Sequence, residues 1–482
     1  MLEILSHQFL KKFVRSHSLD WEHIYSFGRI ISKCIHNDST YLINSEIFST
    51  EHWIVAIFIS LFLHEENSTF VLNSEKIQFF KNNQMEDLRN LGFQYILEND
   101  QLIFSSHRVR LLTLQSLLND SNSFRLNNHR FVLSGIEDIK QDLKDYFRIS
   151  LFKKDWFNQF KQSEHSYQHV TNTYNFFKKK FFLRKSIGNS YLFLEKEELS
   201  FFVKFFNENA SFSDQFLKVS NALSQGWACW VKLDHTNFEW IFYLEPIDEL
   251  SQIREFLNNN KFIFLSALRK DNFFQKYLKN QSLDVDLVVN FKSNFREKKI
   301  SLYVPPKQML PNNPLFNSAI LDKCKKLLIF RKGLSLVLSN DVNLKNYLAT
   351  ELASLYGKRV SLETIPSSKN DILCASFDWW INNSNLVEIP EQIIIPLLPI
   401  PSLSEPINLI TVSYNKKLAK DWFREFLLPE AKVKLERSIS PLRKNSGKLI
   451  ILDGRVNKRK WGTLLLRSIK PSKQINYMLP FD

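Results

Sequence analysis

The chain has 482 residues, which is enough for two to four domains, and its high aromatic content includes 43 phenylalanines. This composition excludes a largely disordered chain. The net charge is +14, and the stretch 416–482 supplies most of it, with 17 lysines and arginines against 6 acids. Such a basic C-terminal part favours a polyanionic partner such as nucleic acid, although basic surfaces also arise simply as solvated faces.

The cysteines and the apolar runs narrow the class further. The four cysteines are far apart and form no CxxC pair: Cys34, Cys229, Cys324 and Cys374. Neither a zinc site nor an iron–sulfur cluster is predicted, and reduced thiols in a cytoplasmic protein are expected. The longest apolar run, 53–63, has 11 residues, whereas a membrane span needs about 20. It predicts a buried helix, and the N-terminus lacks the apolar core of a signal peptide, so no membrane contact is expected.

The first 149 residues alternate between strand and helix patterns. We expect strands at 40–46, 69–74 and 130–135, and helices at 53–63, 109–118 and 136–147. This alternation is typical of a parallel α/β sheet.

Residues 150–225 are rich in phenylalanine and lysine and predict a mainly helical insertion. Aromatic residues alternate there with Lys178, Lys179 and Lys180 in "NFFKKKFFLRK". Such a pattern can stack bases and hold phosphates. A helical core with basic outer faces explains the same pattern.

After the insertion the strand patterns return. Strands are expected at 226–234, 238–246 and 261–266, with a helix at 248–260. Four prolines within 305–314 predict a domain connection. A second α/β unit then follows, with strands at 334–339, 359–364, 371–376, 392–398 and 448–455 and helices at 343–357 and 419–439. The expected division is 1–149 and 226–300 for a first domain, 150–225 for the insertion and 301–482 for a second domain.

Five passages in order resemble the DinG/XPD-like branch of superfamily 2 DNA helicases, and short helicase-like proteins of marine cyanobacteria in particular. They are 244–278 with its Ser266-Ala267, 331–352, 372–380, 393–406 and 422–462. The resemblance covers about 230 residues and implies an α/β fold of two RecA-like parallel-sheet domains. It also implies a motor that uses ATP and magnesium, with DNA, and single-stranded DNA above all, as the partner.

The nucleotide-contacting motifs of that family are degraded here. The passage 43–52, where a phosphate loop belongs, has no glycine or lysine but contains Glu46 and Glu51, and no GxxxxGK[ST] occurs in the chain. Ser134 and Gly135 align with the acidic pair that holds the metal. A shifted register would bring in Glu137 and Asp138, which otherwise resemble acids of a helix start.

The arginine motif and two further motifs also depart from the family. In 436–443, Glu436 aligns with the glutamine, Ser440 with the first arginine and Arg443 with the second. Arg443 is therefore the expected remnant of the nucleotide site. Trp379-Trp380 replaces a Glu-Gly pair, and we expect these rings to fill space that a nucleotide would occupy. Leu268 stands where the Ser-Ala-Thr motif has threonine.

These departures predict a DNA-binding helicase homologue that lacks ATP hydrolysis, catalytic residues, metal ligands and a bound cofactor, in a repair or replication context. Two alternatives remain: an active ATP-dependent helicase with divergent motifs, and a helicase-fold interaction protein without DNA contact. The densest basic cluster, 454–462, places the expected DNA contacts at Lys458, Arg459, Lys460 and Trp461, while Arg455 is expected to pair with Asp453.

Overall fold

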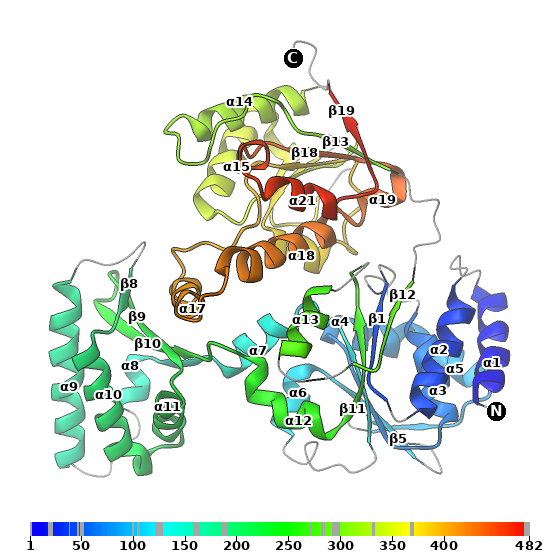
Figure 1. Cartoon of the computed structure of the whole chain (residues 1–482), viewed down its shortest axis with the longest axis horizontal. Helices are drawn as coiled ribbons and strands as arrows, with labels where there is room; N and C mark the ends of the chain where they lie inside the picture. The colour runs from blue at the N-terminus through cyan, green and yellow to red at the C-terminus, as the bar shows by residue number, and fades with distance from the viewer. Residues whose placement is uncertain are drawn as a thin grey trace.

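Two α/β domains and an inserted third unit make up the molecule (Figure 1). The computed structural model describes residues 2–17, 23–37, 39–45, 48, 53–98, 101–103, 107–120, 129–157, 164–184, 190–268, 272–280, 283, 285–291, 299–329, 333–366 and 371–476. The sheets of the two domains confirm the predicted α/β class.

The first domain is built on a sheet in the order β12-β1-β11-β6-β2-β5-β4-β3, parallel except at β4 and β3. Its strands are β1 (Tyr41–Asn44), β2 (Ser68–Val71), β3 (Ile96–Glu98), β4 (Gln101–Ile103), β5 (Arg108–Leu112), β6 (Arg130–Ser134), β11 (Lys261–Ser266) and β12 (Leu287–Asn290). Its helices are α1 (Leu2–His17), α2 (Ile24–His36), α3 (Ile54–Leu63), α4 (Ser74–Phe79), α5 (Met85–Asn90), α6 (Leu114–Asn119), α7 (Ile139–Phe147), α12 (Arg254–Asn259) and α13 (Asn272–Asn280).

Helix α3 is the buried helix that the apolar run predicts. Nine of its ten residues are buried, because α1, α2 and the sheet cover it together. No helix in the described part of the chain is long and apolar enough to cross a membrane.

The helix expected over 109–118 is wrong in its first half. Val109 and Leu111 are buried and alternate with Arg108 and Arg110, which is the period-two pattern of strand β5. Thr113 then caps the short helix α6 by accepting from the backbone N–H of Ser116.

The inserted unit is larger and less helical than the sequence predicts. It has its own antiparallel sheet, in the order β7-β10-β9-β8, formed by β7 (Ile149–Leu151), β8 (Tyr191–Phe193), β9 (Ala228–Asp234) and β10 (Glu239–Glu245). Helices α8 (Lys153–Phe157), α9 (Glu164–Phe182), α10 (Lys196–Asn209) and α11 (Asp214–Ser224) pack on one face. Strands β9 and β10, expected in the first domain, therefore belong to the insertion, which runs from β7 to β10. A pattern of short apolar strands does not tell which sheet they join.

The second domain is an all-parallel sheet in the order β15-β16-β14-β17-β18-β13-β19. Its strands are β13 (Ile300–Tyr303), β14 (Ser335–Leu338), β15 (Val360–Leu362), β16 (Ile372–Ala375), β17 (Gln392–Ile395), β18 (Lys448–Ile451) and β19 (Ser472–Ile475). Helices α14 (Phe316–Leu328) and α15 (Val342–Tyr356) cover one face. The other face carries α16 (Phe377–Asn383), α18 (Leu428–Ile439), α19 (Leu442–Asn445), α20 (Arg455–Lys458) and α21 (Gly462–Ser468).

The prolines of 305–314 suggested a connection between the two domains. The structure shows that this segment lies within the second domain. Strand β13, which precedes it, already pairs with β18 and β19. The segment is held inside the second domain, because Gln308 donates to the carbonyl of Ile451 and Met309 accepts from the N–H of Gly454.

Helix α17 (Pro406–Lys417) of the second domain packs on the free face of the inserted sheet (Figure 1). Ile407 packs in one buried cluster with Ala228 and Trp230 of β9. The inserted unit thus contacts both domains: the first through the chain and the second through α17.

Candidate functional site

The carboxyl ends of three parallel strands meet at the edge of the first domain that faces the second. Strand β11 lies between β1 and β6, and the N–H of Ser45 donates to the carbonyl of Ser266 at 2.9 Å. Ligands of open parallel sheets bind outside such strand ends. Ser266 and Ala267, singled out from the sequence, end β11 at this edge.

Glu137 and Asp138 also lie at this edge, directly after β6. The Glu137 carboxylate accepts from the N–H of Ala267 at 3.1 Å. Asp138 precedes α7, but its side chain caps no backbone N–H there. Asp138 nevertheless occupies the N-cap position of α7, as expected for a helix-start acid, and the shifted register of the acidic pair stays a prediction.

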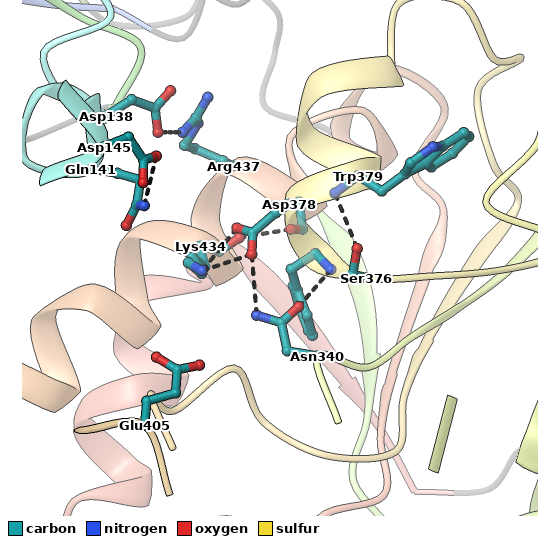
Figure 2. A network of polar contacts seen from close by, with 12 residues as sticks. Asp138, Gln141, Asp145, Asn340, Ser376, Asp378, Trp379, Glu405, Lys434 and Arg437 are labelled. Carbon is teal, nitrogen blue, oxygen red and sulfur yellow. Dashed lines mark hydrogen bonds and ion pairs between the residues drawn. The ribbon is translucent and has the colours of Figure 1, made fainter. Parts of the chain in front are cut away.

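Arg437 of α18 reaches across from the second domain and donates to the carboxylate of Asp138 (Figure 2). Burial disfavours the charged guanidinium, but Asp138 and then Glu137 outweigh that cost, so the pKa of Arg437 is raised. Burial raises the pKa of Glu137, and the charge of Arg437 opposes this rise. The positive charge from the second domain is thus neutralised by protein carboxylates.

A second ion pair joins the same two helices. Lys140 of α7 lies 2.9 Å from Glu430 of α18, and its ammonium lies 4.4 Å from the ring centroid of Phe426. Burial opposes the charge on Lys140, but Glu430 outweighs it and the pKa is raised. Glu249, itself buried, faces the same lysine, yet burial raises the pKa of its carboxyl to about 7.

Behind Arg437, the second domain holds a network of its own. Asp378 in the first turn of α16 pairs with Lys434 of α18 at 2.8 Å, and Asn340 accepts from the N–H of Phe377 at 2.8 Å (Figure 2). Ser376 caps α16 by accepting from the N–H of Trp379. This network fixes the face of α18 that presents Arg437.

Arg443, the arginine expected at the nucleotide site, points elsewhere. Its side chain is buried, and its guanidinium donates to the backbone carbonyls of Ile469 and Pro471. It therefore holds the C-terminal segment rather than the interdomain edge. Arg437, six residues earlier, occupies the edge. The register of the family motif missed it, although Arg437 lies in the same passage, 436–443, at the end of the preceding helix α18.

The two tryptophans of α16 do not fill interdomain space together. Trp380 is fully buried in the core of the second domain, where its indole N–H donates to the carbonyl of Ser438 at 2.9 Å. Trp379 packs partly against the same core, and Figure 2 shows its ring directed away from Asp138 and Arg437.

The residues present do not fit a magnesium triphosphate. Most of the passage 43–52, including Glu46 and Glu51, lies outside the described residues, but the chain contains no phosphate-loop motif. Asp138 and Arg437, which meet at the interdomain edge, bond each other. Within the described ranges, no three His, Cys, Asp or Glu side chains form a group able to hold a metal ion.

The two predicted basic clusters differ in their surroundings. Lys458, Arg459 and Lys460 are exposed, and in the part of the chain that the structure describes they form no ion pair. Arg455 pairs with buried Asp453 at 2.6 Å, as expected. On α9, by contrast, Lys180 lies 3.0 Å from Glu198 and 3.8 Å from Glu195.

The other two lysines of α9 are less constrained than Lys180. Lys179 is exposed and Lys178 is half-buried. In Figure 1, α9 forms the outer edge of the inserted unit, far from the second domain.

No protein-family model matches the chain, and no curated protein sequence matches it. The fold, however, is similar to solved structures of XPD helicases. A structure named XPD_Helicase aligns with a TM-score of 0.59 and 11% identity over 94% of this chain and 99% of that one. XPD_APO gives a TM-score of 0.60 at 11% identity, over 94% of this chain and 100% of that one. Xpd4 of S. tokodaii gives 0.60 at 11% identity, over 95% and 100%. At this identity the comparison shows that the chain has a fold similar to that of XPD helicases.

Proposed function

We propose that this chain is a helicase-fold protein that binds DNA, single-stranded DNA in preference, and does not hydrolyse ATP. The observation that carries the proposal is the pairing of Asp138 with Arg437 across the interdomain edge. Phosphoryl transfer needs a metal-binding acid and an arginine directed at the triphosphate. Here each neutralises the other, so the carboxylate is not available to a metal ion and the guanidinium is not available to a phosphate.

The DNA-binding part of the proposal is supported by charge and by fold. The chain carries +14, and the exposed cations of 458–460 form no ion pair with any described acid. A surface of this kind attracts a polyanion. The resemblance to DinG/XPD-like helicases favours DNA in a repair or replication context over other polyanions.

Two measurements on the purified full chain test the proposal. Calorimetric titration with Mg-ATP is expected to give no heat of binding at micromolar to millimolar nucleotide. Phosphate release is expected to stay at the buffer rate with and without single-stranded DNA. DNA-stimulated phosphate release would show the divergent active helicase instead. Absence of any salt-dependent DNA binding would leave the interaction protein without DNA contact.

Arg437→Lys is a useful companion in both assays. It keeps the charge but loses the forked geometry that pairs with a carboxylate. If Arg437 serves a nucleotide, this variant lowers ATP turnover. If Arg437 only pairs with Asp138, the variant alters the stability of the protein, and neither ATP binding nor phosphate release is detected for it or for the parent chain.

A further inference from the structure

Two segments of the second domain that lie far apart in the sequence meet on its surface. The first, 416–424, runs from the end of α17 into the π-helical turn Phe423–Leu427. The second, 458–461, joins α20 to α21. The rings of Phe423 and Trp461 bring the segments together, with centroids 5.2 Å apart.

Three aromatic rings form the floor of this meeting point. Trp422 and Phe423 lie 6.0 Å apart edge to face, and Trp461 contacts Phe423. All three side chains are half-buried, unlike Trp380 on the same face of the sheet, which is fully buried. A tryptophan at the surface leaves part of an apolar ring in water, which is unfavourable unless something covers it.

Seven cations lie in the two segments that carry these rings. They are Lys416, Lys417, Lys420, Arg424, Lys458, Arg459 and Lys460, all of them exposed. One acid, Asp421, lies in the first segment, and Glu425 follows that segment directly. Arg424 is 3.6 Å from Asp421, and the Lys416 ammonium is 5.4 Å from the Trp422 ring. We call the seven cations and three rings the aromatic–basic platform.

The balance of charge on the platform is unusual for a merely solvated face. Of its seven cations, Arg424 alone forms an ion pair with an acid in the part of the chain that the structure describes. Like charges gathered in this way repel each other, and a polyanion relieves that repulsion while releasing its counterions. The cations therefore favour a polyanionic ligand, and the rings favour a polyanion that exposes flat apolar groups.

We propose that the aromatic–basic platform is a binding site for single-stranded nucleic acid, with bases stacked on Trp422 and Trp461 and phosphates held by the surrounding cations. This rests on the proposed function and locates it. Unpaired bases expose their faces to rings, whereas a duplex hides them in its stack. The platform also lies entirely within the second domain, so occupancy does not require a nucleotide between the domains.

Two sets of variants distinguish a stacking site from a simple charged patch. The cation set is Lys458→Ala/Arg459→Ala/Lys460→Ala. Its matched control is Lys326→Ala/Lys358→Ala/Arg359→Ala, which removes three exposed cations near α14 and α15, on the opposite face of the same sheet. The ring set is Trp422→Leu and Trp461→Leu, with the half-buried Trp227→Leu of the insertion as control.

The readout is fluorescence anisotropy of labelled oligo-dT, about 15 nucleotides long, across a salt series with the full chain. The cation set is expected to weaken binding at least tenfold and to reduce the salt slope by about 2, since each phosphate contact on a single strand contributes about 0.7. Each ring variant is expected to weaken binding about tenfold with the salt slope unchanged. Both controls are expected to match the parent chain.

Trp461→Phe keeps a ring at this position and guards against a folding artefact. It is expected to retain most of the affinity that Trp461→Leu loses, at the same thermal midpoint. A duplex of equal length is expected to bind more weakly than oligo-dT and to be insensitive to the ring set.

The outcomes distinguish the two proposals. If the parent chain binds oligo-dT and the cation set binds with the same affinity and slope, the platform is overturned and the DNA-binding function stands elsewhere on the molecule. If the cation set weakens binding but the ring variants do not, the surface is only an electrostatic patch and the stacking site is overturned. If the parent chain binds no oligo-dT, both proposals fail.

Discussion

The cations of the interdomain edge and those of the aromatic–basic platform differ in their surroundings. At the edge, Arg437 and Lys140 each meet a carboxylate from the facing domain. On the platform, Lys458, Arg459 and Lys460 project into solvent without a described acid beside them. Charges satisfied within the protein hold its parts together, and charges left in solvent are available to a ligand. Under our proposals, the exposed cations of the second domain bind the ligand, and the ion pairs at the edge hold the two domains together.

Replacement of Trp380 by alanine gives the largest expected effect and tests which ring belongs to the core. Removal of this fully buried side chain and of its hydrogen bond to Ser438 is expected to cost about 4 kcal/mol. Trp379→Ala is expected to cost about 1 kcal/mol, because its ring is only partly covered. Urea unfolding followed by circular dichroism measures both. Equal costs would contradict the division between core and surface.

The carboxyl of Glu249 tests the edge through pH. Its folded pKa, about 7, lies above that of an unfolded glutamate, so folding favours the protonated form. Its contribution to stability is greatest at low pH and is lost as pH rises through 7. Glu249→Gln removes this pH dependence. Between pH 5 and pH 8, the unfolding free energy of the variant is expected to rise by about 2 kcal/mol relative to that of the parent chain. Parallel pH profiles of the two unfolding free energies would show that Glu249 does not titrate there.

The pair at the edge is expected to contribute less than a deeply buried one. Arg437→Ala leaves Asp138 without its partner across the edge, but that carboxylate is 42% exposed. Water therefore screens the loss, and a cost of about 1.5 kcal/mol is expected. The control is Lys204→Ala, which breaks the exposed pair with Glu208 on α10 and is expected to cost under about 0.5 kcal/mol.

A double-mutant cycle with Asp138→Asn shows whether the cost arises from the pair itself. If the two substitutions add without coupling, the ion pair does not join the domains.

The smallest effect is expected on α9. Lys178→Ala/Lys179→Ala removes two cations of the insertion and is expected to change oligo-dT affinity less than about twofold, because this helix lies far from the platform (Figure 1). The anisotropy assay measures it directly. A loss as large as that of the 458–460 triple variant would move the binding site, or part of it, to the insertion.

The sequence predicted most of the sheet strands because their apolar runs are short and bounded by turn residues, as in 334–339 and 371–376. The prediction failed where the place of a segment depends on residues far away in the sequence. Strands β9 and β10 have the same pattern whichever sheet they join, and only the packing of Ile407 on Trp230 shows which face the second domain covers. Prolines at 305–314 indicated a break in regular structure but not its place within a domain.

The site was predicted unevenly for a similar reason. Exposed cations at 458–460 follow from the cost of burying unpaired charge, so a single segment of sequence suffices to predict them. The pairing of Asp138 with Arg437 joins residues about 300 positions apart, and no local pattern contains it. A motif register taken from a distant family selected Arg443 instead, because both arginines lie within the passage 436–443 that the motif covers.

The measurement that tests the central claim most directly is the affinity for single-stranded DNA with and without Mg-ATP. If cohesion at the edge comes from protein ion pairs and binding occurs on the platform, the oligo-dT dissociation constant is the same in buffer, in Mg-ATP and in a non-hydrolysable analogue. A nucleotide-dependent shift of that constant of tenfold, equivalent to about 1.4 kcal/mol of coupling, would show that the edge still binds nucleotide and would contradict the account.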